Sequence, residues 1–255
     1  MSSNLDPLKL LQCTELLQVS KHTAILSGAG ISTASGIPDF RSAGSGLWQK
    51  HDPLQVASLS SFQNQPAVFF EWLHPLAVQI QKAQPNPAHL AVAELQSLGI
   101  ISSVITQNID SLHTLAGSTH VIEIHGNLHQ WACTKCQSSR DQTKLLQTYC
   151  DTGKAPVCKQ CGNYLKPGIV LFEETLSPQV WKEAVDTVKG SEVLLIIGTS
   201  LSVGPANELP LLALKNKSKL IIMTNSPTHL DASAMIVLHE NVDIVLPALV
   251  KVLGV

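Results

Sequence analysis

The sequence predicts an α/β fold: a Rossmann-like parallel sheet with helices on both faces, plus a small zinc-ribbon module. Short apolar runs alternate with segments of helical periodicity, an order typical of a parallel sheet that is covered on both faces. A glycine-rich turn, Gly28-Ala29-Gly30, follows the first apolar run, as in sheets that bind a ligand at their carboxyl edge. Two C-x2-C pairs interrupt this alternation in a polar stretch, which predicts an inserted metal module.

The N-terminal part of the chain contains a helix pattern followed by a strand pattern. Leucines at helical spacing predict a helix over 8–19, and an apolar run predicts a buried strand over 23–26. The two glycines of the turn allow a sharp bend and a close approach of the backbone to a ligand. Ser32 and Thr33 are expected to cap a helix whose free N–H groups would suit a pyrophosphate.

The next segments are a loop and two helices. The stretch 41–53 is rich in glycine and serine and is expected to be either a plain surface loop or a lid over a ligand. Apolar spacing predicts helices over 66–82 and 87–98, and Pro75 is expected to kink or break the first of them. An asparagine before the second helix and a glycine after it are suitable caps.

Polar residues follow several of the later strands. The later apolar runs predict strands over 100–106, 121–124, 193–197, 220–223 and 244–246, with a short C-terminal helix after the last. The polar residues that stand directly after these runs are Gln107-Asn108-Ile109-Asp110, His125-Gly126, Gly198-Thr199-Ser200 and Thr224-Asn225-Ser226. Open α/β sheets bind ligands in this position. Helix capping by Asn108 or Asp110 is the alternative interpretation.

Length and charge limit the classes of protein. The chain has 255 residues and a formal net charge of −2, and it contains no run of lysine and arginine typical of nucleic-acid binding. No signal-peptide pattern and no membrane-spanning apolar run are visible. We therefore expect a soluble cytoplasmic protein without nucleic-acid or membrane partners. We expect one domain over 1–255, with a Rossmann-like part over about 8–65, 84–130 and 167–253, a helical insert over about 66–83 and a zinc module over about 131–166.

Four of the six cysteines form the C-x2-C pairs: Cys133, Cys136, Cys158 and Cys161. This spacing predicts a closed tetrahedral zinc site, which is structural because no position is left open for water. An iron–sulfur cluster is less favoured, since the spacing matches no ferredoxin pattern. The stretch 133–166 is polar, and we expect it to depend on the metal because it cannot hold itself together by burial. Cys13 and Cys150 are given no role.

His125 is the candidate general base. It follows a predicted strand, and Gly126 is expected to leave room beside the imidazole ring. A neutral imidazole can accept a proton near physiological pH, although a lone histidine is more often structural. The chain has neither a G-x-S-x-G nor an H-E-x-x-H motif, so the sequence supports neither a serine hydrolase elbow nor that type of metalloenzyme.

The order of these motifs resembles that of the sirtuins, the NAD-dependent protein deacylases. The resemblance covers about 8–253 and rests on the block 28–41, on 107–110, 125–126 and 198–206, on Asn225 and on the two cysteine pairs. It implies that NAD and an acyl-lysine peptide meet in a cleft between the sheet and the zinc module. The acyl group then passes to ADP-ribose and nicotinamide leaves. The cofactors implied are NAD as co-substrate and one structural Zn²⁺ per chain.

The resemblance also implies residue roles. His125 is the general base for a ribose hydroxyl, Asn108 orients the ribose and a nearby water, and Asp110 with Ile109 holds the nicotinamide carboxamide. The full set of implied NAD-binding residues is Gly28, Ala29, Gly30, Ser32, Asp39, Phe40, Arg41, Trp48, Gln107, Asn108, Ile109, Asp110, His125, Gly198, Thr199, Ser200, Asn225, Ser226 and Val242. Val170, Phe172 and Val203 are implied to bind the peptide as an added strand.

The chain departs from the sirtuin pattern at two positions. Where the family usually has Phe-Gly-Glu, this chain has Phe172-Glu173-Glu174, which removes the backbone freedom of glycine and adds a charge. Two positions after Asn225, Pro227 stands where the family often has an acidic residue. These departures affect the predicted peptide preference and one ribose hydrogen bond, and neither changes a bond-making residue.

The resemblance also bears on the acyl group and leaves rival activities open. Sirtuins that prefer succinyl- or malonyl-lysine carry a tyrosine and an arginine on the helix after the loop, and the matching stretch 69–80 has neither. His74 is the only substitute there.

Mono-ADP-ribosyl transfer is a rival on the same fold. A dehydrogenase is disfavoured by the missing third glycine, and a nucleic-acid-binding zinc ribbon by the low positive charge.

Overall fold

The computed structural model describes residues 5–39, 46–49, 51–136 and 144–254. The chain forms two compact units. The larger unit comprises Met1–Ser35, Gln84–Ile124 and Ser177–Val255, and the smaller unit comprises Gly36–Ala83 and His125–Leu176. No helix within the described ranges has both the length and the apolarity that a membrane crossing requires.

The larger unit is built on a six-stranded sheet in the order β3-β2-β1-β6-β7-β8, in which every neighbouring pair is parallel. The strands are β1 (Thr23–Ser27), β2 (Ser103–Thr106), β3 (Val121–Glu123), β6 (Val193–Ile197), β7 (Lys219–Met223) and β8 (Ile236–Leu238). Every residue of β1, β2 and β6 is buried, as expected for central strands with both faces covered. The predicted parallel sheet is confirmed.

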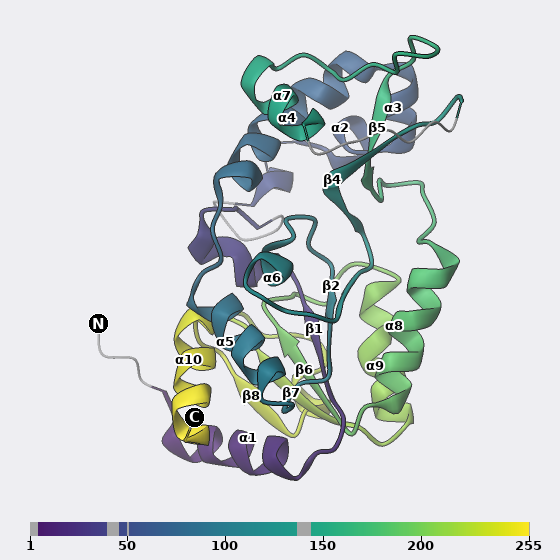
Figure 1. The fold of residues 1–255 in the computed structure, drawn as a ribbon. Helices are drawn as coiled ribbons and strands as arrows, with labels where there is room; N and C mark the ends of the chain where they lie inside the picture. Colours follow the sequence, from purple (N-terminus) through teal and green to yellow (C-terminus); the bar gives the residue numbers. More distant parts are fainter. Residues whose placement is uncertain (1–4, 40–45, 50, 137–143, 255) are drawn as a thin grey trace. The chain divides into compact units, whose positions relative to one another are not determined.

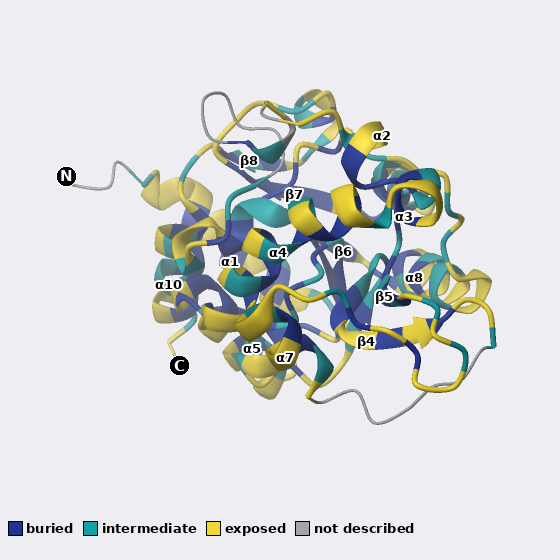
Figure 2. Ribbon diagram, turned by 90° about the horizontal axis from the view of Figure 1, so that it is seen from above, coloured by how far each residue is buried: buried dark blue, intermediate teal, exposed yellow. Residues whose placement is uncertain are grey.

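Helices cover both faces of this sheet (Figure 1). One face packs against α1 (Pro7–Val19), α5 (Pro87–Ser97) and α10 (Val242–Leu253), and the other against α8 (Pro178–Gly190) and α9 (Leu209–Lys215). Figure 2 shows most of the sheet around the labels β6 and β7 as dark blue, buried ribbon and the outer turns of the helices as yellow, exposed ribbon. The predicted caps of α5 are confirmed: the Asn86 side chain accepts from backbone N–H groups of the first turn, and Gly99 has a φ of +73°.

The shorter elements of the larger unit lie in its connections. They are the 3₁₀ helices η1 (Ala29–Ser35), η3 (Ala206–Glu208) and η4 (Asp231–Ser233), and the short helix α6 (Leu112–Leu115). Ser32 and Thr33 lie inside η1, so the prediction that they cap a following helix is wrong. The turn after β1 is itself the helical segment, because it tightens at once into 3₁₀ geometry.

Two predicted strands are wrong in position or extent. The segment predicted as a strand over 244–246 belongs to α10, and the last strand is β8. Val242, Val245, Leu246, Leu249 and Val250 are the buried residues of α10, and this spacing of three and four residues places them on one helical face. The strand predicted over 100–106 begins only at Ser103, because the preceding residues form the turn that ends α5.

The smaller unit combines helices with a two-stranded antiparallel sheet. Its elements are η2 (Leu47–Gln49), α2 (Pro53–Val56), α3 (Leu59–Asn64), α4 (Pro66–Lys82), β4 (Gly126–Cys133), α7 (Leu145–Thr152) and β5 (Leu165–Ile169). Pro75 lies inside α4, and the helix continues past it, so the expected break does not occur. A proline removes only one helical hydrogen bond, and the buried apolar face of α4 outweighs that loss.

An aromatic cluster holds the polar insert against α4. Trp131 and Tyr149 are fully buried, and their ring centroids lie 5.8 Å apart. The Tyr149 ring also contacts Phe70, and its hydroxyl donates to the Phe70 backbone carbonyl. The insert is therefore buried in part through contacts with residues outside it, which the sequence analysis did not anticipate. This cluster could not be predicted from the sequence, because its members lie on elements that are far apart in the chain.

Candidate functional site

Three turns of the larger unit meet at the carboxyl edge of the sheet. Gly28 to Gly30 follow β1, Gly198 to Ser200 follow β6, and Asn225 follows Thr224 after β7. The chain runs outward from β1 to β2 and β3 on one side, and from β6 to β7 and β8 on the other. The order of strands therefore switches between β1 and β6, which is where open α/β sheets bind their ligands.

The glycines of these turns allow two backbones to approach closely. A Cβ atom at Gly30 would lie 2.7 Å from the Gly198 carbonyl oxygen, and one at Gly198 would lie 2.5 Å from the Ile31 nitrogen. The Gly30 N–H donates to the same carbonyl across 2.8 Å. A Cβ atom at Gly28 would lie 2.7 Å from the Thr199 Cβ. The turns after β1 and β6 can thus pack directly against each other only because these positions are glycines. The sequence pattern did not reveal this requirement for glycine.

Free backbone donors line these turns. Within the described part of the chain, the N–H groups of Ala29, Thr199 and Asn225 have no hydrogen-bond acceptor. Backbone N–H groups gathered in turns at one sheet edge suit the oxygens of phosphates and sugars. These residues therefore fit the phosphate and ribose parts of a dinucleotide such as NAD.

A buried polar network lies beside the turn after β1. The Asn108 side-chain amide donates to Ser32 Oγ across 3.0 Å, and Ser32 Oγ donates to Asp110 Oδ2 across 2.7 Å. The other Asp110 carboxylate oxygen accepts from the Leu112 N–H at 2.9 Å. Burial raises the pKa of the Asp110 carboxyl above its usual value, while the hydrogen bonds from Leu112, Ser32 and Asn108 act in the opposite direction. The network fixes the Asn108 and Asp110 side chains in single orientations.

Two buried histidines support this network, and the sequence analysis did not single them out. His89 Nε2 lies 3.5 Å from Ser32 Oγ, and His113 Nε2 lies 3.0 Å from Ser27 Oγ. Burial lowers the pKa of His89 to about 4 and that of His113 to about 3, so both rings are neutral at neutral pH. Their spacing carries no motif, so only the folded contacts identify them.

The remaining predicted residues of the larger unit have distinct settings. The Gln107 amide donates to Thr199 Oγ1 across 3.0 Å, and Ile109 is half-buried. Ser200 and Ser226 are exposed, Val203 is half-buried, and Val242 is buried as the first residue of α10. Phe40 and Arg41 lie outside the described residues, as does the side chain of Trp48 in η2. The predicted loop over 41–53, with its lid interpretation, lies partly outside the described residues, at 41–45 and 50.

In the smaller unit, His125 stands directly before β4. His125 is half-buried, and its backbone carbonyl accepts from the Val170 N–H across 2.9 Å. Gly126 has a φ of +69°, and a Cβ atom there would lie 1.9 Å from the Gly168 carbonyl oxygen. Gly126 is thus required by the close approach of β4 to β5, where it pairs with Ile169.

The predicted peptide segment and Asp39 also belong to this unit. Phe172 pairs in parallel with Ser58: its N–H donates to the Ala57 carbonyl, and its carbonyl accepts from the Leu59 N–H. Val170 is half-buried between His125 and this pairing. The Asp39 carbonyl accepts from the Leu47 N–H across 3.0 Å. The backbone of the peptide segment is therefore anchored at both ends.

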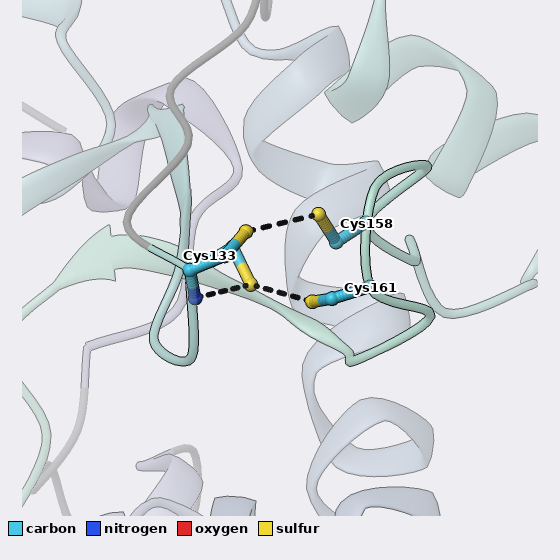
Figure 3. Close-up of side chains that lie close together, drawn as sticks. Cys133, Cys158 and Cys161 are labelled. Atoms are coloured by element: carbon cyan, nitrogen blue, oxygen red, sulfur yellow. Dashed lines mark hydrogen bonds between the residues drawn. The ribbon is translucent and has the colours of Figure 1, made fainter.

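The four cysteines of the C-x2-C pairs gather at one point, and Figure 3 labels three of them: Cys133, Cys158 and Cys161. All four sulfur atoms lie within 4.8 Å of one another, with 3.5 Å between those of Cys133 and Cys161 and 3.6 Å between those of Cys136 and Cys158. A disulfide would need about 2.05 Å. Sulfurs bound to one tetrahedral zinc at about 2.3 Å would be separated by roughly 3.8 Å. The cluster therefore fits a structural zinc ion.

Comparisons with known proteins match this architecture. A sequence model described as the Sir2 family matches residues 28–205. The chain is 40% identical over 244 residues to the NAD-dependent protein deacylase 2 of Archaeoglobus fulgidus, and the match covers 95% of each chain. It is 41% identical over 237 residues to the NAD-dependent protein deacetylase of Sulfolobus acidocaldarius, covering 93% of this chain and 92% of that relative.

Solved structures agree with the sequence comparisons. One described as "Structural Basis for the Mechanism and Regulation of Sir2 Enzymes" is similar with a TM-score of 0.90 and 39% identity, and covers 98% of this chain and 99% of that one. A structure of Sir2 with a p53 peptide and NAD⁺ has a TM-score of 0.87 and 33% identity, and covers 95% of this chain and 98% of that one. The likeness extends over both units of the chain.

Proposed function

Since this chain belongs to the Sir2 family, we propose that it is an NAD-dependent protein-lysine deacylase, which transfers an acyl group to ADP-ribose and releases nicotinamide. The observation that carries this proposal is the buried network in which Ser32 joins Asn108 and Asp110 at the sheet edge. Relatives named as deacylases match almost the whole chain, and one similar Sir2 structure holds a deacetylated p53 peptide with 3′-O-acetyl-ADP-ribose.

The residues of the network, and with them Ile109 and His125, have separate proposed tasks. When bound, NAD supplies the ribose carbon that receives the acyl oxygen and the nicotinamide leaving group. The Asn108 amide donates to Ser32, which leaves its carbonyl oxygen to accept a hydrogen bond from a ribose hydroxyl. Asp110 holds the nicotinamide carboxamide, and Ile109 packs beside it. An imidazole nitrogen of His125 takes a proton from a ribose hydroxyl and so makes that oxygen a nucleophile.

The proposed zinc ion has no part in the chemistry. Four cysteine thiolates fill a tetrahedral shell, so no position is left for a water or a substrate oxygen. Its proposed task is to hold β4 and β5 together at their outer ends. The predictions of a cytoplasmic location and of no nucleic-acid or membrane partner still rest on the sequence pattern alone.

The products of a single reaction test the proposed function. Wild-type protein incubated with NAD and an acetyl-lysine peptide is expected to release nicotinamide, deacetylated peptide and O-acetyl-ADP-ribose in equal amounts, because each turnover transfers one acyl group. Mass spectrometry of the mixture measures all three products. Formation of NADH would instead support a dehydrogenase, and ADP-ribose attached to protein without peptide deacetylation would support the ADP-ribosyl transferase.

We also expect a preference for uncharged acyl groups. α4 contains neither a tyrosine nor an arginine, and its buried residues are apolar, including Phe70, Leu73 and Leu76. His74 Nε2 already lies 3.0 Å from the Cys150 carbonyl, and its ring contacts Tyr149. A succinyl carboxylate beside α4 would therefore lose water without gaining a cation. Acetyl-lysine, or a longer apolar acyl-lysine, should exceed succinyl-lysine by at least about tenfold in kcat/KM, equivalent to roughly 1.4 kcal/mol.

A neutral isostere separates charge from length in this comparison. One peptide is prepared with acetyl-, butyryl-, myristoyl-, succinyl- or succinamyl-lysine, the last being an uncharged amide of the same size as succinyl. Nicotinamide release is measured for each. We expect succinamyl-lysine to react faster than succinyl-lysine. Equal rates for acetyl- and succinyl-lysine would show that a cation from another part of the chain binds the succinyl carboxylate. The predicted preference for uncharged acyl groups would then be wrong.

A further inference from the structure

Glu173 adopts a backbone conformation that is normally left to glycine. Its φ is +73°, and it is the third residue of a turn in which the Glu174 N–H donates to the Leu171 carbonyl across 3.1 Å. In type II turns this position requires a positive φ, which favours glycine or asparagine. A residue with a long side chain persists there only when its surroundings hold it in place.

The side chain of Glu173 supplies that restraint. One carboxylate oxygen accepts from the Ser60 N–H across 2.9 Å, and the other accepts from the Ser60 hydroxyl across 3.0 Å. Ser60 follows Ser58, which pairs with Phe172, so main-chain and side-chain bonds tie the same two segments together. We call this two-oxygen contact between Glu173 and Ser60 the clamp.

An ion pair between Lys166 and Glu174 stiffens the same turn from its other side. Glu174 Oε2 lies 2.9 Å from the Lys166 ammonium and accepts from the Leu171 N–H, also across 2.9 Å. Lys166 in turn donates to the Ile169 carbonyl across 2.6 Å. The Lys166 and Glu174 side chains are largely buried, so their ion pair and hydrogen bonds fix the start of the turn at Leu171. The position of the third residue of the turn, Glu173, is then set by the clamp.

The turn leaves backbone groups available for an added strand. Among the residues that the structure describes, the N–H and carbonyl of Glu173 and the carbonyl of Val170 have no hydrogen-bond partner. Unpaired backbone groups next to an extended segment are where a peptide pairs as a further strand. The direction of the Glu173 N–H depends on the φ that the clamp maintains.

We propose that Glu173 is a positioning residue for the acyl-lysine peptide, and that its clamp on Ser60 holds the 171–174 turn in the conformation that pairs with the peptide backbone. The inference rests on the proposed function, because it needs an acyl-lysine peptide as ligand. Where the family usually has a glycine, this chain has Glu173, and the hydrogen bonds from its carboxylate to Ser60 hold the positive φ that a glycine would adopt without help.

Two substitutions at Glu173 test the clamp. Glu173→Gly removes the tie, and Glu173→Gln keeps a side-chain oxygen that can accept from the Ser60 N–H. Binding of a fluorescent acetyl-lysine peptide is measured by anisotropy without NAD. We expect Glu173→Gly to raise the peptide Kd about five- to tenfold, equivalent to roughly 1–1.4 kcal/mol, and Glu173→Gln to stay within about twofold of wild type. In turnover, the peptide KM should rise in parallel, while kcat and the KM for NAD stay within about twofold.

Ser60→Ala provides the matched partner variant. It removes the hydroxyl and keeps the Ser60 N–H, so a small rise in Kd of about twofold is expected. In the Glu173→Gly background the same substitution should have no further effect, because contacting residues are not additive. An unchanged Kd in Glu173→Gly would overturn the proposal. So would an equal loss in Glu173→Gln, since charge rather than the clamp would then attract the peptide.

Failure of the proposed function would look different. Wild-type protein that neither binds the acetyl-lysine peptide nor releases nicotinamide with it would overturn both the function and the positioning role. Wild-type binding and turnover together with unchanged variants would overturn the role of Glu173 alone.

Discussion

A His125→Ala variant is expected to lose about 10²- to 10⁴-fold in kcat, the range for removal of a general base. The imidazole is the proposed acceptor of the ribose hydroxyl proton, and alanine leaves no group that can take it. The His125 backbone is held by its own carbonyl, which accepts from the Val170 N–H, and by the constrained Gly126 that follows. Neither depends on the ring, so the fold should survive. Nicotinamide release with a saturating acetyl-lysine peptide measures the loss.

A surface histidine provides the control for this variant. His22 is exposed and precedes β1, at the end of that strand opposite to the candidate site. His22→Ala should keep kcat within about twofold of wild type, as expected for a surface substitution. NAD binding, followed by calorimetry, should be nearly the same in all three proteins. Full deacylation by a folded His125→Ala protein would falsify its role as base.

A Cys158→Ala variant is expected to lose zinc and with it the fold of the module around β4, α7 and β5. A structural zinc site supplies about 10–16 kcal/mol in small zinc-finger peptides, which is comparable with the whole stability of about 5–15 kcal/mol of a typical domain. The aromatic packing of Phe70, Trp131 and Tyr149 offsets only part of this loss. We expect a fall in Tm of about 10 °C or more, since 1 kcal/mol changes Tm by about 2–4 °C at this chain length.

Metal content, thermal unfolding and limited proteolysis check this prediction together. Wild type should contain about one zinc per chain, and Cys158→Ala none, with new cleavage sites between β4 and β5. Cys150→Ala is the matched control, because this cysteine lies in α7, outside the cluster of four. It should keep its zinc and a nearly unchanged Tm. A zinc-free Cys158→Ala protein with wild-type Tm and activity would show that the cluster is not a structural metal site.

The sequence predicts most of the sheet, because buried strands leave a local signature. Val193–Ile197 and Thr23–Ser27 are short apolar runs followed by glycine, and both are central strands. The metal cluster is equally local, since each C-x2-C pair brings two thiols close together within one turn. The motif order then identifies the family, which the comparisons confirm.

Residues 244–246 show where local pattern fails. Three apolar residues in a row look like a strand, but the spacing of buried residues over the whole of Val242–Leu253 is helical. Only packing against the sheet and α5 reveals that longer period, because a short window samples too few turns of a helix.

From its sequence alone, this protein is determined to be a parallel α/β enzyme of the Sir2 family with a four-cysteine cluster, because these features rest on residues that are close in the chain or in a set order. Tertiary structure decides the rest. It brings His89 to Ser32, crosses the backbones at Gly30 and Gly198, and ties Glu173 to Ser60. Each of these is a contact between distant segments, whose energy depends on side-chain geometry that no local pattern encodes.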